Sequence, residues 1–206
     1  MAKVSKYLNW PRIILASGSP RRKSLLQAVG ADFKVVIPRV EEDGIENLTP
    51  ETAVKQLARK KALEVRSRLS RCDRKRLIVA ADTVVAYRHH VLGKPENGIQ
   101  AVKMLKMLSG RWHQVYTGLC LISPRDGRIT TGYEATKVKF RRLSAVYINN
   151  YVVSGEPLDK AGAYGIQELG ALVVEKVDGC YFNVVGLPLV KLDKMIRSLK
   201  PEKTGR

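Results

Sequence analysis

A segment near the start of the chain combines an apolar run, a turn of small residues and a proline that opens a helix. The run Ile13–Ala16 predicts a short buried strand, and residues 17–19 form the turn. Ser19 suits the N-cap and Pro20 the first helical position, where its missing N–H costs no hydrogen bond. Gly30 suits the end of this helix. A strand that feeds directly into a helix indicates an α/β fold.

The start of that helix predicts an anion site, because free backbone N–H groups and the helix dipole both favour negative charge there. Arg21 and Arg22 lie in the first turn, where cations work against the dipole. A bound polyphosphate would explain the two arginines. A solvated and somewhat unfavourable surface is the alternative, and spacing alone does not choose between them.

Length and charge limit the class of protein. The 206 residues suffice for a single domain over 1–206, or for two small lobes around a cleft, with flexible tails expected at 1–11 and 201–206. The excess of 37 basic over 19 acidic residues favours polyanionic partners such as nucleotides or nucleic acid. It is concentrated at 59–76 and in the tail from 191, where solvated faces are the ordinary explanation. Charge therefore does not separate a nucleotide enzyme from an RNA-binding protein.

Cysteine use indicates a reducing, intracellular setting. Cys72, Cys120 and Cys180 are odd in number and widely spaced, with no CxxC pair, so neither a disulfide framework nor a structural zinc site is indicated. No apolar run approaches the roughly 20 residues of a membrane helix. We therefore expect no membrane partner.

The remaining patterns alternate between helix and strand. Strands are expected over 33–37, 77–81, 112–122, 128–140 and 171–177, and helices over 50–69, 98–108, 144–153 and 188–199. Pro124 and Gly127 mark a turn between the two long strands, so these predict a β-hairpin. Because helices and strands alternate first and a hairpin follows, we expect an α/β fold with a mixed sheet.

Asp82 is the first candidate for catalysis. It follows the apolar run 77–81, and open α/β sheets place ligands at the ends of such strands. An Asp that accepts local backbone N–H groups is the structural alternative. Together with Glu41 or Glu42 it would form an oxygen-rich site for Mg²⁺ or Mn²⁺. On spacing alone the two glutamates form an exposed turn.

Three further side chains are suited to a nucleotide. Lys61 and Lys94 can neutralise phosphate oxygens as point charges, and Gly93 and Pro95 hold Lys94 in a defined loop. Gln167 follows a glycine-rich segment, where its amide can read a base edge or merely stabilise its own loop.

Taken together, these segments resemble the Maf family of nucleoside triphosphate pyrophosphatases. The resemblance runs in the family's order through nearly the whole chain, over residues 15–22, 40–42, 61–62, 81–83, 93–95, 159–167 and 183–188. The first segment and 159–167 are the most specific, whereas Gly93-Lys94-Pro95 alone would be weak.

The resemblance implies one domain with a mixed twisted sheet flanked by helices and two lobes around a nucleotide cleft, as in ITPase-like proteins. It implies a cytoplasmic homodimer that cleans the nucleotide pool by hydrolysing triphosphates to monophosphate and pyrophosphate with Mg²⁺ or Mn²⁺. Asp82 matches the catalytic base. Phosphate and metal contacts are implied for Ser17, Arg21, Arg22, Glu42, Lys61, Lys94 and Asp82, and base selection for Arg21, Thr83 and Gln167. This last combination resembles the subfamily that prefers dTTP and UTP, including modified uridine triphosphates.

Two other functions stay open on the sequence. One is a pyrophosphatase for purine triphosphates such as ITP or XTP. The other is a non-catalytic nucleotide- or nucleic-acid-binding regulator of cell division. Against the second, the chain lacks aromatic-rich strands of the kind that stack bases, so nucleic acid is not expected as a partner.

Overall fold

The computed structural model describes residues 8–41, 44 and 48–199. The strands are β1 (Ile13–Ala16), β2 (Phe33–Val35), β3 (Leu77–Tyr87), β4 (His90–Leu92), β5 (Trp112–Ile122), β6 (Ile129–Phe140) and β7 (Val174–Asp178). The helices are α2 (Pro20–Ala28), α3 (Pro50–Arg68), α4 (Gly98–Leu108), α5 (Ala145–Val153), α6 (Tyr181–Val185) and α7 (Leu189–Ser198). Short 3₁₀ turns are η1 (Asp73–Lys75), η2 (Glu156–Asp159), η3 (Ala161–Ala163) and η4 (Glu168–Leu172).

All the described strands form one mixed sheet. Its order is β2-β1-β3-β5-β6-β7, and β4 pairs with β3 as well. β1 is parallel to β2 and β3, while β3, β5, β6 and β7 pair antiparallel in sequence, as do β3 and β4. The expected α/β fold with a mixed sheet and a β5–β6 hairpin is confirmed.

Helices cover both faces of this sheet. Ile78 and Ala80 of β3 pack in one apolar cluster with Ala58 and Ala62 of α3. Their neighbour Val79 belongs to a second cluster on the other face, formed with α2 and α7. Alternation along the strand sends successive side chains to opposite faces, so one buried strand supports both layers.

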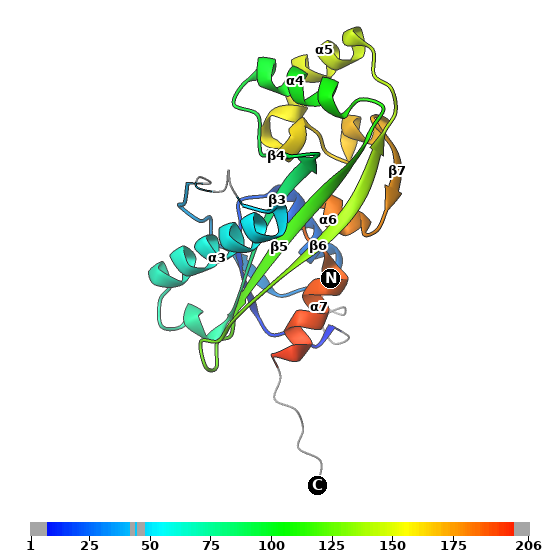
Figure 1. Cartoon of the computed structure of the whole chain (residues 1–206). Coiled ribbons are helices and arrows are strands. Elements are labelled where there is room, and N and C mark those ends of the chain that lie inside the picture. Colours follow the sequence, from blue (N-terminus) through cyan, green and yellow to red (C-terminus); the bar gives the residue numbers. More distant parts are fainter. Residues whose placement is uncertain (1–7, 42–43, 45–47, 200–206) are drawn as a thin grey trace.

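The molecule has two lobes joined by the long strands. In Figure 1, α4 and α5 lie at one end of β3, β5 and β6, while α3 and α7 lie toward the other. The end with α4 and α5 has its own apolar cluster, which includes Val85, Val115 and Phe140. The expected arrangement of two lobes within one sheet-based domain is therefore observed.

The structure corrects several expected bounds. β3 does not stop at residue 81 but continues to Tyr87, because it pairs with β5 as far as Ala86 and with β4 from Val85 to Tyr87. β2 covers only Phe33–Val35, since its partner β1 is four residues long. η4 occupies the expected start of β7. The short helix α6 was not predicted.

Both chain ends fall mostly outside the described residues, and with them most of the expected tails. Within the described part, Trp10 donates a hydrogen bond from Nε1 to Asp193 of α7 at 2.7 Å and packs against the α2–α7 cluster. None of the described helices combines the length and the apolarity that crossing a membrane requires.

Candidate active site

A large cavity lies where β3 is left without a neighbour on one edge. β1 pairs with β3 only as far as Ala80, and β4 pairs with it only from Val85. Between them lies the open stretch of β3, residues 81–84, which no described strand pairs on that edge. A cavity of about 590 Å³ lies against this stretch, between the two lobes.

Every predicted site residue in the described part of the chain lines this cavity. They are Ser17, Arg21, Arg22, Lys61, Asp82, Thr83, Lys94 and Gln167. Glu42 lies outside the described residues. Val40, two positions before it, lines the cavity, and Glu41 is exposed. Side chains far apart in the sequence thus meet in one place.

The start of α2 forms one wall. The Ser19 hydroxyl accepts a hydrogen bond from the backbone N–H of Arg22, so its predicted N-cap role is confirmed, with Pro20 at the start of the helix. The Ser17 hydroxyl accepts from the backbone N–H of Ser19 at 3.2 Å. A helix N-terminus facing a cavity favours a bound anion.

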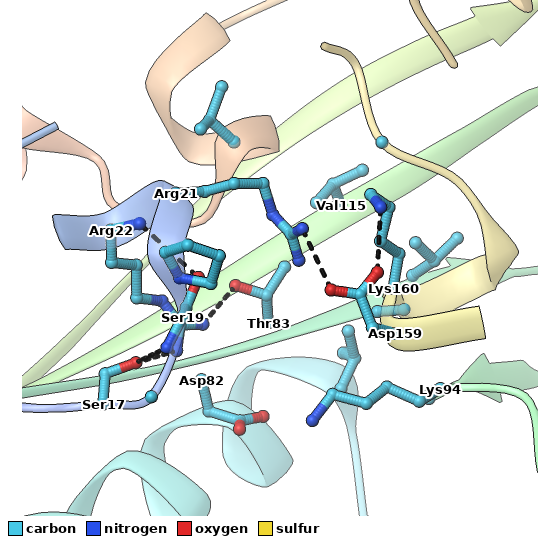
Figure 2. A pocket seen from close by; sticks show the side chains of 18 of the residues that line it. Ser17, Ser19, Arg21, Arg22, Asp82, Thr83, Lys94, Val115, Asp159 and Lys160 are labelled. Atoms are coloured by element: carbon cyan, nitrogen blue, oxygen red, sulfur yellow. Dashed lines mark hydrogen bonds and ion pairs between the residues drawn. The ribbon is translucent and has the colours of Figure 1, made fainter. Parts of the chain in front are cut away.

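Arg22 is buried and connects three segments. Its guanidinium donates to the Ser17 hydroxyl at 3.0 Å and to the Thr83 hydroxyl at 3.0 Å (Figure 2). It also donates to the carbonyl of Gly186 at 2.8 Å. A solvated surface is therefore the wrong explanation for this arginine. Arg21 instead points across the cavity and forms an ion pair with Asp159 of η2 at 3.3 Å.

Lys61 and Asp82 form a buried ion pair between α3 and β3. Lys61 lies on the buried face of α3 with Val54, Ala58 and Val65, and its ammonium group donates to a carboxylate oxygen of Asp82. The side chains are only 8% and 6% exposed. The expectation that Asp82 ends a strand is wrong, because Asp82 lies within β3. It nevertheless lies just beyond the carboxyl end of β1, at the edge where the parallel part of the sheet stops.

A glycine allows α3 to lie this close to the sheet. Gly118 of β5 is the register partner of Asp82. A Cβ at Gly118 would lie 2.2 Å from the carbonyl oxygen of Val54, a distance that no side chain tolerates. The helix backbone therefore rests directly on the strand, one face of α3 is held against β3, and Lys61 reaches Asp82.

The other lobe contributes a loop and a 3₁₀ segment. Lys94 follows β4, and in Figure 2 its ammonium group and the Asp82 carboxylate point into the same space. The carbonyl of Gly93 accepts a hydrogen bond from the backbone of Gly162 at 2.9 Å. Gly162 has φ 68°, and a Cβ there would lie 2.7 Å from Val85. This glycine lets the segment 159–167 lie directly over β3.

Tyr164 is the buried residue that holds the segment 159–167 in place. Its hydroxyl hydrogen-bonds Nε2 of His113 at 2.8 Å, and both rings pack edge-on against Phe140. Burial lowers the pKa of His113 to about 4, against a smaller opposing effect of the Arg111 backbone. Burial also raises the pKa of Tyr164. Both groups are therefore neutral at pH 7, and Gln167 lines the cavity at the end of the segment they hold.

The cavity thus has a charged side and a mainly apolar side, which we call the neutral side although the Arg22 guanidinium borders it at Thr83. Asp82, Lys61 and Lys94 bring full charges to one side. Thr83 points to the opposite face of β3. There the lining is mainly apolar and includes Val85, Val115, Ile166, Val184 and Val185. A ligand with a polyanionic end and an uncharged ring end matches this division.

Comparison with known proteins decides the family. A family model described as Maf-like protein matches residues 12–199. The chain belongs to the Maf-like family. A dTTP/UTP pyrophosphatase of Acetivibrio thermocellus is 48% identical over 189 residues, covering 90% of this chain and 94% of the relative. A dTTP/UTP pyrophosphatase of Thermosipho melanesiensis is 49% identical over 180 residues, covering 87% and 93%.

Among solved structures, that of the Staphylococcus aureus Ham1 protein matches with a TM-score of 0.47 at 14% identity. It covers 92% of this chain and 100% of that one. This likeness is too distant to bear on the site.

Sequence reasoning on this Maf-like protein missed two charged residues of the cavity, Asp159 and Lys160. The Lys160 ammonium group is buried and donates to Asp159 at 2.8 Å and to the carbonyl of Glu156 at 2.6 Å. Partial burial acts to raise the pKa of Asp159, but the hydrogen bond from Lys160 and the charge of Arg21 together hold it below its usual value. Their place inside a family-specific segment was the available signal.

Metal ligands are few in the described part of this Maf-like protein. No group of three or more His, Cys, Asp or Glu side chains there is arranged to hold an ion. The described carboxylates of the cavity are Asp82 and Asp159, each already beside a lysine. Such a donor set suits a cation that is held by one or two carboxylates together with substrate phosphates.

Proposed function

We propose that this protein hydrolyses dTTP and UTP, and modified uridine triphosphates, to the nucleoside monophosphate and pyrophosphate. The division of one cavity into a charged and a neutral side is the observation that carries the proposal. The triphosphate lies on the charged side, beside Lys61 and Lys94, and extends to the start of α2, which borders both sides. The base lies on the neutral side, against Thr83 and the apolar wall. The relatives named dTTP/UTP pyrophosphatase, similar over most of their length, support the same reaction.

The reaction requires a water molecule positioned at the α-phosphorus. The oxygen of this water forms a bond to the α-phosphorus. The bond between the α-phosphorus and the oxygen that bridges it to the β-phosphate breaks, and pyrophosphate leaves with that oxygen. Asp82 is the candidate acceptor for the proton of that water, because its carboxylate points into the cavity beside the cations. Arg21, Arg22, Lys61, Lys94 and the α2 N-terminus balance the charge that develops on the phosphoryl oxygens and the leaving group.

A divalent cation fits this scheme. Asp82 offers a carboxylate, Glu42 is a second candidate from outside the described residues, and the triphosphate itself completes the ligand set. When bound, Mg²⁺ or Mn²⁺ supplies additional neutralisation of the phosphate oxygens.

The first test is product identification. Purified protein is incubated with each common nucleoside triphosphate and with Mg²⁺ or Mn²⁺, and the products are separated. We expect pyrophosphate and monophosphate from dTTP and UTP, and no release after addition of a chelator. Orthophosphate as the product would contradict attack at the α-phosphorus.

The alternatives predict different results. A preference for ITP or XTP would indicate a purine enzyme. Salt-sensitive RNA binding without turnover of any triphosphate would indicate a regulatory binding protein, because phosphate contacts weaken as salt rises.

Assembly and location complete the proposal. We expect a cytoplasmic homodimer, as the resemblance to the Maf family implies. Sedimentation equilibrium on the full chain tests the dimer, and fractionation of the source cells tests the location.

A further inference from the structure

Thr83 takes part in a chain of hydrogen bonds whose direction can be worked out. Its hydroxyl oxygen accepts from Arg22 at 3.0 Å, and a guanidinium group only donates. The same oxygen lies 2.9 Å from the hydroxyl of Thr117, its register partner on β5, where either group can be the donor. The direction of this second hydrogen bond decides what Thr83 offers to the cavity.

Thr117 settles that direction. It is fully buried, and its hydroxyl donates to the backbone carbonyl of Asn183 at 3.0 Å. A carbonyl can only accept, so the single proton of Thr117 is committed there. The proton between the two threonines must therefore come from Thr83.

The carbonyl at the end of the chain is itself held in place. The Asn183 side chain is completely buried and donates to the carbonyl of Val115 and to the Thr136 hydroxyl, both at 2.9 Å. With its proton directed to Thr117 and one lone pair used by Arg22, Thr83, which lines the cavity, has one lone pair left to accept a further hydrogen bond. On this geometry Thr83 is an acceptor and not a donor.

A hydrogen-bond acceptor on the neutral side distinguishes uracil and thymine from cytosine at a single ring position. Uracil and thymine carry an N–H donor at ring position 3, whereas cytosine carries a bare nitrogen that accepts. We propose that Thr117, which touches no substrate, is a positioning residue that fixes Thr83 as the acceptor for this N–H and so excludes cytosine. The inference rests on the proposed function, because it assumes that the base lies beside Thr83.

Two variants of Thr117 separate polarity from packing. Thr117→Val keeps the shape but removes the hydroxyl, so the Thr83 proton is released and can turn to the cavity. Thr117→Ser keeps the hydroxyl and loses only a methyl group. We expect Thr117→Val to reduce the preference for UTP over CTP about tenfold or more, chiefly through KM, and Thr117→Ser to retain it.

Binding is measured alongside turnover. The α,β-methylene analogues of UTP and CTP, which resist cleavage at the α-phosphate, are titrated calorimetrically into wild type and both variants. Equal binding of the two analogues by wild type, or the same preference in Thr117→Val as in Thr117→Ser, overturns the inference. If wild type prefers the UTP analogue but cleaves no pyrimidine triphosphate, the proposed function fails while the binding ratios still decide the role of Thr117. Absence of binding overturns both.

A variant at Thr83 keeps the test decisive if Thr117→Val misfolds because the Asn183 carbonyl loses its donor. Thr83→Val removes the acceptor and leaves Thr117 in place. Its preference for the UTP analogue must collapse, and a preference equal to that of wild type overturns the inference. Circular dichroism and thermal melting establish that each variant is folded at the temperature used.

Discussion

Asp82 and Thr83 are adjacent on β3, yet they lie in opposite environments. Asp82 faces α3 and pairs with the buried ammonium group of Lys61. Thr83 faces α2 and α6, within a chain of hydrogen bonds that passes through Thr117 to a backbone carbonyl. Strand alternation separates the two side chains, and the missing neighbour of the open stretch lets both reach one cavity. One strand can thus supply a carboxylate for the reaction on one side and a hydroxyl for recognition on the other.

The largest effect is expected on the charged side, for Asp82→Asn. The amide cannot accept the proton of the attacking water, so kcat for UTP should fall by about 10² to 10⁴. Loss of the negative charge beside Lys61 should also lower the free energy of unfolding, by up to about 3 kcal/mol. Steady-state kinetics and urea unfolding measure the two effects separately. Near-normal turnover in folded Asp82→Asn would remove Asp82 from the chemistry and with it the contrast between the two sides.

The next effect concerns the neutral side, where the stability of the protein should depend on pH through His113. His113 supports Tyr164, and its pKa is lowered to about 4 in the folded protein, against about 6.5 when exposed. As pH falls, His113 is therefore protonated in the unfolded chain before it is protonated in the folded protein. Its contribution to the free energy of unfolding is complete above pH 6.5 and is lost as pH falls toward 4. The loss due to His113 should be about 3 kcal/mol.

Urea unfolding at pH 7 and pH 4 measures this loss, with His113→Phe as the comparison. The phenylalanine keeps a ring against Phe140 but does not titrate, so the fall in stability over this pH range should be smaller by about that amount. An identical fall in both proteins would show that His113 is not held neutral by its surroundings.

The features of the charged and neutral sides that depend on residues close together in the sequence were predictable. The turn before α2 was identified correctly, because Ser19 and Pro20 act through the residues next to them. The apolar stripe of α3 predicts its buried face, and Lys61 lies on that stripe between Ala58 and Val65. A cation at a core position of a helix is in itself a signal for a buried partner.

Other features depend on contacts between distant residues and leave no local pattern. In the sequence, the apolar run before Asp82 has the pattern of a strand that ends there, because a charged carboxylate interrupts it, while pairing with β5 continues the strand. The hydrogen bonds of Thr83 with Thr117, and of His113 with Tyr164, join residues 34 and 51 positions apart. Their polar side chains look like ordinary strand and loop residues until the sheet register is known.

A smaller effect is expected for Gly186→Ala, which crowds Thr83 and the Arg22 guanidinium beside it. Gly186 has φ 113°, and an added Cβ would lie 3.4 Å from the Thr83 hydroxyl and 3.5 Å from Nε of Arg22. We expect a loss of about 1–3 kcal/mol from backbone strain, and a KM for UTP that rises several-fold with a smaller fall in kcat, because Arg22 is displaced as well as Thr83.

Gly155→Ala is the matched control for that variant. Gly155 also has a positive φ, 78°, but a Cβ there would meet nothing within 4 Å. It should therefore lose stability without a change in KM. If both variants raise KM alike, the effect of Gly186 is a general consequence of destabilisation and not of crowding at Thr83.

The smallest effect is expected for Asp159→Asn, at an exposed residue of the cavity lining. The ion pair between Arg21 and Asp159 joins the two lobes, but the Asp159 side chain is 61% exposed, so its contribution to stability should stay below about 1 kcal/mol. Removing a negative charge near the triphosphate should lower KM by at most about threefold at low ionic strength. The difference should disappear near 0.5 M salt, where charges separated by more than a few ångströms are screened.

Asp126→Asn, in the β5–β6 turn and away from the cavity lining, removes the same charge and serves as the control. Its KM should follow wild type at every salt concentration, because only the charge at Asp159 lies beside the substrate. A fall in kcat for Asp159→Asn as large as that for Asp82→Asn would place a second carboxylate in the chemistry. The carboxylates that take part in the reaction would then lie in both lobes, and the open stretch of β3 would no longer separate reaction from recognition.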